Sequence, residues 1–304
     1  MAVIRILHFS DVHLEGPTRG APLREWINKR GVAYVAHRLI RRHRFEDAER
    51  KLEALARLAA HERVDMALCT GDHTALGTHP ELARARRVLE PFAAAPLGLM
   101  ALPGNHDVFL PASVRDRRFE RYFGDLCATD RPDLTVDGRW PLVRLPAPGL
   151  AVVAVNTVRP NPPLWRSSGR IPDAQLQVLR RVLADPELRR RFVVVALHHA
   201  PRLASGRPDR FWHGLVNADA LRRALAGLGA GMLVHGHVHQ RYHLDAACFG
   251  VPLFGAGSVT HGGREGFWLY EVGPEGEVRA HGGRWTGQRY ELQGPPVQVS
   301  WRGR

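Results

Sequence analysis

The stretch VIRILHFSDVH, residues 3–13, joins an apolar run to two polar side chains. Val3–Phe9 is short, apolar and rich in β-branched residues, which predicts a buried strand. Asp11 and His13 follow where this strand should end, and Val12 separates them, so that both point to one side of an extended chain. The stretch therefore predicts a strand that delivers a carboxylate and an imidazole to the edge of a sheet.

Further short runs share this apolar character, and helical patterns separate several of them. The runs are Val64–Thr70, Leu97–Leu102, Leu150–Asn156, Phe192–His198 and Met232–His235. Apolar residues recur at helical spacing in Asp47–His61, Pro80–Phe92 and Pro172–Leu183. This alternation predicts an α/β fold. After Gly236 we expect a second, largely antiparallel sheet from the short strands Gln240–Ala246, Val251–Gly255, Gly266–Glu271 and Glu277–His281.

The composition is that of a folded, basic protein. The 304 residues include 43 Lys and Arg against 30 Asp and Glu, a formal net charge of +13, and 44% are hydrophobic, which excludes disorder as the main state. Neither a repeat nor a clear linker interrupts the chain, so we expect a single domain over residues 1–304. Cys69, Cys127 and Cys248 are too widely spaced for a disulfide framework or a thiolate metal site, and we expect them in the core.

The apolar runs are too short to cross a membrane. Phe192–Leu197 is among the longest, and it falls well short of the roughly 18 residues that a spanning helix needs. Arg5 interrupts the first apolar stretch and Ser10–His13 is polar, which does not fit a signal peptide. We therefore expect a cytoplasmic protein.

Polar clusters stand at the ends of five of the apolar runs. They are Asp11-Val12-His13, Gly71-Asp72-His73, Gly104-Asn105-His106-Asp107, His198-His199 and His235-Gly236-His237-Val238-His239. Ligands of open α/β sheets bind beyond the carboxyl ends of the strands. We therefore expect the clusters to converge on one rim.

The side chains of these clusters form a mixed set of oxygen and nitrogen ligands. The candidate metal ligands are Asp11, His13, Asp72, Asn105, His198, His237 and His239. Such a set, without thiolate, suits Mn, Fe or Zn. Because it exceeds what one ion takes once water is bound, we expect two divalent transition-metal ions about 3.5–4 Å apart. Asp72 is the candidate bridging carboxylate.

In this order the clusters resemble the motifs D-x-H, G-D, G-N-H-D, H and G-H-x-H of the calcineurin-type metallophosphoesterases. The resemblance implies a four-layer α/β/β/α sandwich with a dinuclear metal centre on one edge. It assigns one ion to Asp11, His13, Asp72 and His239, and the other to Asp72, Asn105, His198 and His237. It also places His106 beside the metals without binding them.

The resemblance implies a hydrolase of phosphate esters, more specifically of phosphodiesters, in which metal-bound hydroxide attacks phosphorus. His106 would stabilise developing charge or protonate the leaving alkoxide, and Asp107 would orient the His106 imidazole. The pattern G-x-I-x-x-x-Q-L in Gly169–Leu183 is similar to the phosphodiesterase branch related to cyclic-nucleotide and glycerophosphodiester hydrolases. The chain departs from that branch at Gly71–Gly77, which lacks the second Asp of G-D-L-T-D-x-G, and at Ala200, where many relatives have Pro.

Several other histidines have a structural alternative. His198 and His199 face opposite sides of an extended chain, so only one reaches the metals, and the family pattern favours His198. His199 would then line the pocket or close a hydrogen bond. A structural, hydrogen-bonded role is the default for His73, His235, His243 and His261. Of these, His73 lies near enough to the rim to touch substrate.

The segment Arg19–Arg44 is basic and amphipathic. It holds eight Lys and Arg against one acidic residue, with Trp26, Ile27, Tyr34, Val35, Leu39 and Ile40 interspersed. One interpretation is a helical insertion, at about residues 19–44, that packs its apolar side on the body of the protein. The other, which we favour, is a cap that faces a lipid or nucleotide substrate, or an anionic membrane surface.

The expected substrate is a phosphate ester of a nucleotide, a glycerophosphodiester or a lipid-linked ester, and three alternative functions stay open. A nuclease of the same superfamily would suit the net charge of +13, but the chain lacks an obvious aromatic-rich binding module, so nucleic acid is a less expected partner. A lipid-linked pyrophosphate or phosphodiester hydrolase would use Arg19–Arg44 at the inner membrane surface. A non-catalytic phosphate-binding scaffold is disfavoured by the intact Asp11, Asp72, Asn105 and His106.

Overall fold

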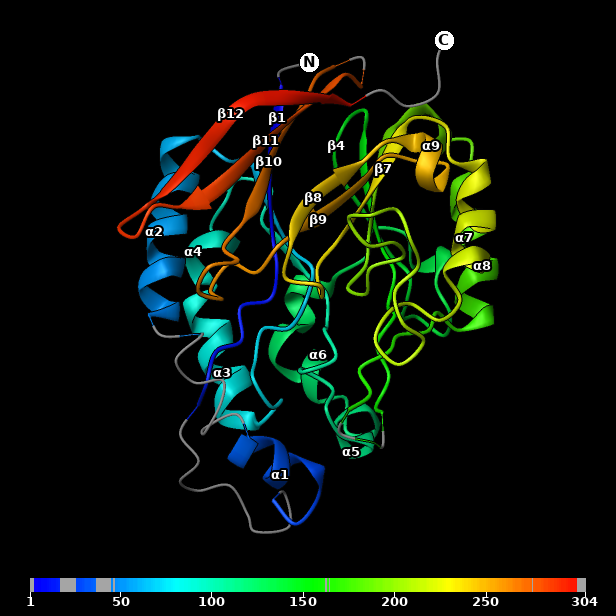
Figure 1. Cartoon of the computed structure of the whole chain (residues 1–304). Coiled ribbons are helices and arrows are strands. Elements are labelled where there is room, and N and C mark those ends of the chain that lie inside the picture. The colour runs from blue at the N-terminus through cyan, green and yellow to red at the C-terminus, as the bar shows by residue number, and fades with distance from the viewer. Residues whose placement is uncertain are drawn as a thin grey trace.

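The computed structural model of the chain describes residues 3–16, 26–36, 45, 47–161, 163, 165–274 and 276–299. Within these ranges two six-stranded sheets pack against each other, and helices cover both outer faces (Figure 1). This four-layer α/β/β/α arrangement confirms the expected fold class.

The first sheet has the strand order β12-β11-β10-β1-β2-β3. Its strands are β1 (Ile4–Phe9), β2 (Met66–Cys69), β3 (Leu99–Ala101), β10 (Phe267–Val272), β11 (Val278–Trp285) and β12 (Tyr290–Val299). β1, β2 and β3 are parallel, and β10, β11 and β12 extend the sheet in antiparallel pairs. The carboxyl ends of three parallel strands therefore meet at one edge.

The second sheet has the order β4-β5-β6-β7-β9-β8. Its strands are β4 (Leu142–Ala147), β5 (Leu150–Ala154), β6 (Phe192–Ala196), β7 (Gly231–His235), β8 (Arg241–Leu244) and β9 (Leu253–Ala256). β5, β6, β7 and β9 are parallel, whereas β4 and β8 are antiparallel strands at the two edges.

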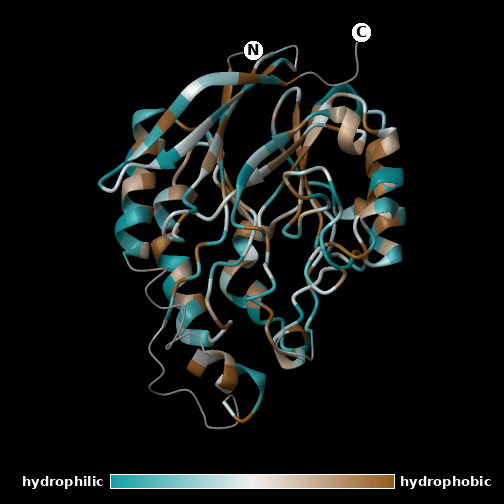
Figure 2. Cartoon of the chain, in the orientation of Figure 1, coloured by the Kyte–Doolittle hydropathy of each residue, from teal (hydrophilic) through white to brown (hydrophobic). Residues whose placement is uncertain are grey.

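The alternation of side chains along the strands builds the core in layers. On β1, Ile4 and Ile6 face the second sheet, whereas Leu7 and Phe9 face the helices on the outside of the first. Burying a side chain of this size contributes roughly 1.5–3 kcal/mol. Figure 2 shows hydrophobic residues along the central strands, while β8, β11, β12 and the helices carry hydrophilic and hydrophobic residues together. The central strands are thus buried on both faces, whereas β12 is exposed along its middle.

Helices cover the two outer faces of the sandwich. The first sheet is covered by α2 (Ala48–His61), α3 (His79–Val88), α4 (Glu90–Ala93) and α6 (Arg118–Phe123), and the second by α7 (Asp173–Ala184) and α8 (Ala218–Ala224). The short helices α5 (Pro111–Arg115) and α9 (Ala246–Phe249) lie in connections. A capping box starts α3: the Thr78 hydroxyl accepts from the Glu81 N–H, and the Glu81 carboxylate accepts from the Thr78 N–H.

The expectation of a separate carboxyl-terminal sheet is wrong. β8 and β9 join the second sheet, and β10, β11 and β12 join the first. Periodicity within a strand reports which face is buried but not which strand lies beside it, and for this reason the sequence pattern misassigned these partners. In addition, Pro80–Phe92 forms two helices rather than one, and β4 and β12 had not been expected.

The cysteines differ in their burial. Cys69 is buried in the core as expected, but Cys127 is half-buried and Cys248 is exposed, which corrects the expectation for these two. All three are free thiols.

The basic segment contributes one described helix, α1 (Lys29–Ala36). Residues 19–25 and 37–44 of the predicted insertion lie outside the described residues, and they include Arg19, Arg24, Arg38, Arg41, Arg42 and Arg44. Among the helices that the structure describes, none is both long and apolar enough to cross a bilayer.

Candidate metal centre

The five polar clusters meet where strands of both sheets end. Asp11 and His13 follow β1, Asp72 follows β2 and Asn105 follows β3, all in the first sheet, whereas the remaining clusters lie at the ends of β6 and β7 in the second. The site therefore lies across the two sheets, and the structure brings all seven predicted metal ligands into it.

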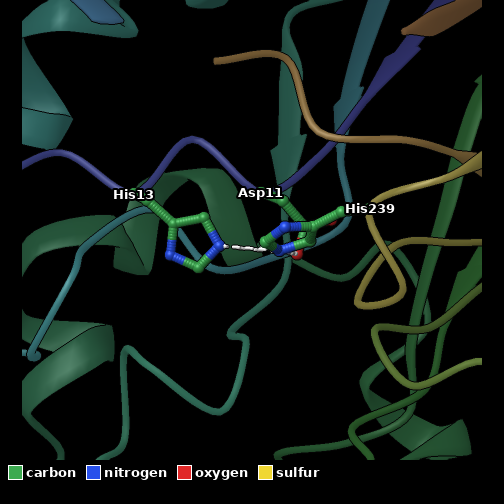
Figure 3. A group of neighbouring side chains, drawn as sticks. All are labelled: Asp11, His13 and His239. Carbon is green, nitrogen blue, oxygen red and sulfur yellow. Dashed lines mark hydrogen bonds and ion pairs between the residues drawn. The ribbon is translucent and has the colours of Figure 1, made fainter. Parts of the chain in front are cut away.

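One ligand group contains Asp11, His13 and His239 (Figure 3). His239 Nε2 lies 3.0 Å from His13 Nε2 and 3.2 Å from Asp11 Oδ1. His13 Nε2 also lies 3.8 Å from Asp11 Oδ1 and 3.8 Å from Asp72 Oδ2. Figure 3 shows the His239 imidazole beside Asp11 and His13, which both come from the segment after β1.

A second group contains Asp72, His198 and His237. Asp72 Oδ2 lies 3.4 Å from His198 Nε2, and Asn105 Oδ1 lies 3.1 Å from the same nitrogen. Asp72 Oδ2 thus faces ligand atoms of both groups, which is the placement that a bridging carboxylate requires.

The donor atoms fit a bound cation. With metal–ligand bonds of about 2.0–2.2 Å, neighbouring ligand atoms lie roughly 3–3.5 Å apart, and the distances within both groups are close to this range. Asp11 Oδ1 is buried and has no hydrogen-bond partner among the described residues, although its sister atom Oδ2 accepts from the His237 N–H at 2.9 Å. A buried carboxylate oxygen of this kind is costly unless a cation satisfies it.

Hydrogen bonds to backbone carbonyls orient two of the ligand imidazoles. His198 Nδ1 donates to the Thr70 carbonyl at 2.8 Å, and His237 Nε2 donates to the His213 carbonyl at 2.9 Å. Such a bond fixes the tautomer and leaves the opposite ring nitrogen free to ligate a metal.

The electrostatics of the site reflect burial and crowding. Burial holds the pKa of His13 and of His237 well below the ordinary value, so both rings are neutral and able to ligate. Although burial opposes it, His198 and its neighbours hold the pKa of Asp72 well below the usual range. Burial also acts against protonation of His198, but the Asp72 carboxylate outweighs it and raises the pKa of His198 to about 9.

The backbone at the ligands is strained. Five of the seven predicted ligands have left-handed φ values: Asp11 57°, His13 48°, Asp72 55°, His237 73° and His239 50°. Such conformations cost on the order of 1–3 kcal/mol each and persist where the surroundings impose them. Here the two loops are paired, because the Asp11 N–H donates to Gly71 O and the His13 N–H donates to Asp72 O, each at 2.9 Å.

Two motif glycines permit the close approach of these loops. A Cβ on Gly104 would lie 2.1 Å from Asp72 N and Oδ1, and a Cβ on Gly236 would lie 1.9 Å from Ser10 Oγ. Neither position therefore accommodates a side chain. Steric exclusion of a side chain therefore explains why glycine stands in G-N-H-D and in G-H-x-H, which the sequence pattern alone did not explain.

The structure corrects the expected role of Asp107. Its carboxylate does not orient His106 but accepts from the N–H groups of His73, Thr74 and Gly104, from His73 Nδ1 and from the Thr74 hydroxyl. The His106 ring is instead oriented by Nδ1, which donates to the Ala75 carbonyl at 2.5 Å. Asp107 therefore ties the loop of Asp72 to the loop of Asn105.

Some of the remaining histidines have a structural role, and one lines the cleft. His73 is fully buried, bonded to Asp107 and packed against Phe119 and Phe123, so it does not reach a substrate. Burial opposes its protonation, but Cys69 and Asp107 raise the pKa of His73 overall. His235 is buried against the Tyr242 hydroxyl, 3.0 Å away. The two others lie nearer the surface: His243 packs on Phe254, and His261 lines the cleft described next.

A cleft of about 700 Å³ opens over the ligand groups. Besides the predicted residues it is lined by Lys29, Phe109, Arg159, Trp165, Arg166, His213, His261 and Arg264. The sequence marks none of these as site residues, because they lie in α1 and in loops without a motif, although Lys29 falls in the Arg19–Arg44 segment. Residues of α1 line the cleft, and a cap that faces the substrate stays a prediction.

Comparison of the sequence and comparison of the structure both find similar proteins. The family model for the calcineurin-like phosphoesterases matches residues 4–241. The chain is 32% identical over 206 residues to the 3′,5′-cyclic adenosine monophosphate phosphodiesterase CpdA of Pseudomonas aeruginosa, a match that covers 64% of this chain and 62% of that protein.

Solved structures agree at the level of fold. A dimetal phosphatase from Danio rerio superposes with a TM-score of 0.67 and 16% identity, covering 99% of this chain and 100% of that one. A purple acid phosphatase from yellow lupin, Lupinus luteus, gives a TM-score of 0.64 and 11% identity, covering 98% of this chain and 54% of that one. Since the family model spans most of the sequence and includes all five polar clusters, this chain belongs to the calcineurin-like phosphoesterase family.

Proposed function

We propose that this metal-dependent phosphoester hydrolase cleaves phosphodiesters at a centre for two divalent transition-metal ions, Mn, Fe or Zn. The observation that carries the proposal is the pair of ligand groups on either side of Asp72, with the buried Asp11 Oδ1, which has no hydrogen bond among the described residues, in one of them. The similarity to CpdA, a protein named as a cyclic-nucleotide phosphodiesterase, supports a diester over a monoester.

The proposed division of ligands follows the two groups. Asp11, His13 and His239 would hold one ion, and Asn105, His198 and His237 the other, with Asp72 shared between them. Two bound cations would neutralise phosphoryl oxygens and lower the pKa of the water that attacks phosphorus. The protein's part is to hold four imidazoles, an amide and two carboxylates at fixed positions.

His106 would handle the proton of the leaving group. Its backbone N–H donates to Asp72 Oδ1 at 2.8 Å, and its Nδ1 is occupied by the Ala75 carbonyl. A ring nitrogen of His106 lies within 4.8 Å of ligand atoms of His13 and Asp72. Nε2 is therefore the atom that would carry a proton to the leaving oxygen, a contribution worth roughly 10²–10⁴ in rate.

Among substrates, a cyclic or other nucleotide diester is our first candidate, ahead of glycerophosphodiesters and lipid-linked esters. Of the aromatic side chains that line the cleft, Phe109 and Trp165 could stack on a base. A nuclease is not favoured. A cytoplasmic location, with contact to an anionic membrane surface through Arg19–Arg44, stays a prediction.

Metal analysis combined with turnover tests the proposal. We expect about two transition-metal ions per purified chain, and faster hydrolysis of bis-p-nitrophenyl phosphate than of p-nitrophenyl phosphate. Asp72→Ala should lose both metal and turnover, whereas Asp137→Asn, an exchange at an exposed turn, should keep both. Full metal content and wild-type turnover in Asp72→Ala would refute the shared centre.

A further inference from the structure

The loop between β5 and α7 carries two arginines into the cleft. Arg159 Nη2 and Arg166 Nε both donate to the hydroxyl of Ser168, each at 3.0 Å, and Arg159 Nε also donates to the Ser168 carbonyl at 3.3 Å. Ser168 is fully buried. One serine therefore gathers two guanidinium groups in the wall of the cleft.

These two charges have no counter-ion among the residues that the structure describes. Among the described residues neither Arg159 nor Arg166 has a carboxylate within ion-pair distance, and burial together with the nearby Arg166 lowers the pKa of Arg159. Asp72 is the sole carboxylate among the described residues that line the cleft. Holding two like charges together without a partner is unfavourable unless an anion arrives to neutralise them.

A third cation reaches the same loop from α1. Lys29 Nζ donates to the Asn161 carbonyl and lies 4.5 Å from the centre of the Phe109 ring. The Asn161 amide in turn donates to the carbonyls of Arg159 at 3.2 Å and Ser168 at 3.0 Å. Lys29, Arg159 and Arg166 therefore line the cleft around this one loop, and we refer to the three together as the cation cluster.

His199 fixes the cation cluster relative to the metal ligands. Its Nε2 donates to the Ser167 carbonyl at 2.9 Å, and its Nδ1 accepts from the Thr157 hydroxyl at 2.8 Å. The neighbouring residue in the chain is the predicted ligand His198. A Cβ on Gly169 would lie 2.3 Å from His199 Nδ1, so the loop can lie this close to the ring only with glycine there.

From this geometry we infer that the substrate carries a second phosphate group, which the cation cluster binds while the scissile phosphodiester lies at the metal centre. The inference rests on the proposed function and narrows its first candidate, from nucleotide diesters in general to those that carry a further phosphate group, so that a 3′,5′-cyclic monophosphate is no longer the preferred substrate. A simple diester has a single negative charge, which the metal centre would neutralise, and this leaves the cation cluster without a ligand. Guanidinium groups bind phosphate oxygens through paired, charge-assisted hydrogen bonds, which suits Arg159 and Arg166 to this role.

Two esters that differ by one phosphate test this inference. Thymidine 5′-(p-nitrophenyl phosphate), with and without a 3′-phosphate, releases the same chromophore. We expect the wild-type protein to show a kcat/KM roughly 10-fold or more higher for the 3′-phosphorylated ester. Arg166→Ala and Arg159→Ala should bring this ratio towards one, and Arg166→Lys should keep part of it. Arg57→Ala, at an exposed position of α2, is the matched control and should keep the wild-type ratio.

A binding measurement without turnover separates this inference from the proposed function. In EDTA, where the metal centre no longer competes for phosphate, calorimetry should show thymidine 3′-monophosphate binding roughly 10-fold more tightly than thymidine, with the preference lost in Arg166→Ala. Equal binding of these two compounds, or equal kcat/KM for the two esters, would overturn the second-phosphate site. Failure of the Mn-loaded protein to hydrolyse any diester, with the binding preference intact, would instead overturn the proposed function alone.

Discussion

Replacing Asp107 by Asn separates a role in stability from a role in catalysis. The buried carboxylate accepts from five donors: Oδ2 from His73 N, His73 Nδ1 and Gly104 N, and Oδ1 from Thr74 N and the Thr74 hydroxyl. In Asn one of these oxygens becomes an NH₂ group. The less costly choice is at Oδ1, because the Thr74 hydroxyl can turn to accept while only the Thr74 N–H is left without an acceptor.

The magnitude follows from those contacts. An unsatisfied buried N–H costs about 1–3 kcal/mol, and the remaining bonds weaken because they no longer end on a charge. We therefore expect Asp107→Asn to lower the free energy of unfolding by about 2–4 kcal/mol. Metal affinity should fall too, because Asp107 joins the loops that carry Asp72 and Asn105.

Urea denaturation of the metal-free proteins, followed by circular dichroism, measures the first effect, and metal titration measures the second. Asp137→Asn is the control, because Asp137 is exposed and has a φ of 51°, a conformation that Asn tolerates. Its free energy of unfolding should stay within about 0.5 kcal/mol of wild type. An Asp107→Asn protein with wild-type stability and metal content but little turnover would refute this reasoning and restore the role of orienting His106.

Four further predictions address catalysis, stability, pH and the cap. His106→Ala should keep its metals and lose roughly 10²–10⁴ in turnover, with a smaller loss for p-nitrophenyl than for alkyl diesters; equal losses would argue against proton transfer. Arg63 occupies the left-handed position of the turn that ends α2, with a φ of 52°. Arg63→Gly should therefore raise the free energy of unfolding by about 0.5–1 kcal/mol and leave turnover unchanged. A lower urea midpoint in this variant would contradict the prediction. Burial raises the pKa of Glu81 from 4.5 to about 7, although hydrogen bonds from Thr78 and Leu76 act against this shift. Between these two pH values the native state binds more protons than the unfolded chain, so the free energy of unfolding should fall as pH rises through them. Glu81→Gln should abolish that fall, and parallel pH profiles of unfolding in the two proteins would contradict this assignment to Glu81. Ile27 and Val35 of the basic segment are 74% and 54% exposed, so sedimentation with anionic vesicles should weaken in Ile27→Ser, whereas absence of wild-type binding at low salt would reject the lipid-facing cap.

Some features of this protein follow from local sequence. The apolar strand of residues 4–9 and the D-x-H motif after it are contiguous, and period-two alternation places Ile6 and Leu7 on opposite faces wherever the strand lies. The order of the five polar clusters likewise sufficed to predict the family, the sandwich and a convergent set of ligands, because each cluster needs only a strand before it.

The remaining features depend on segments that are distant in the chain. β10 lies beside β1 although more than 250 residues separate Ile4 from its partner Val272, and nothing local to either strand specifies that pairing. The Asp107 carboxylate accepts hydrogen bonds from His73 and Thr74 and does not orient the adjacent His106, because of the way in which two loops pack. The cation cluster has the same origin, because Lys29 and Arg166 line one cleft only where α1 packs beside the loop before α7. Residue type and periodicity determined which side chains stand at each strand end. Which of these side chains act together was decided by contacts between distant segments, because such contacts depend on the packing of the whole chain.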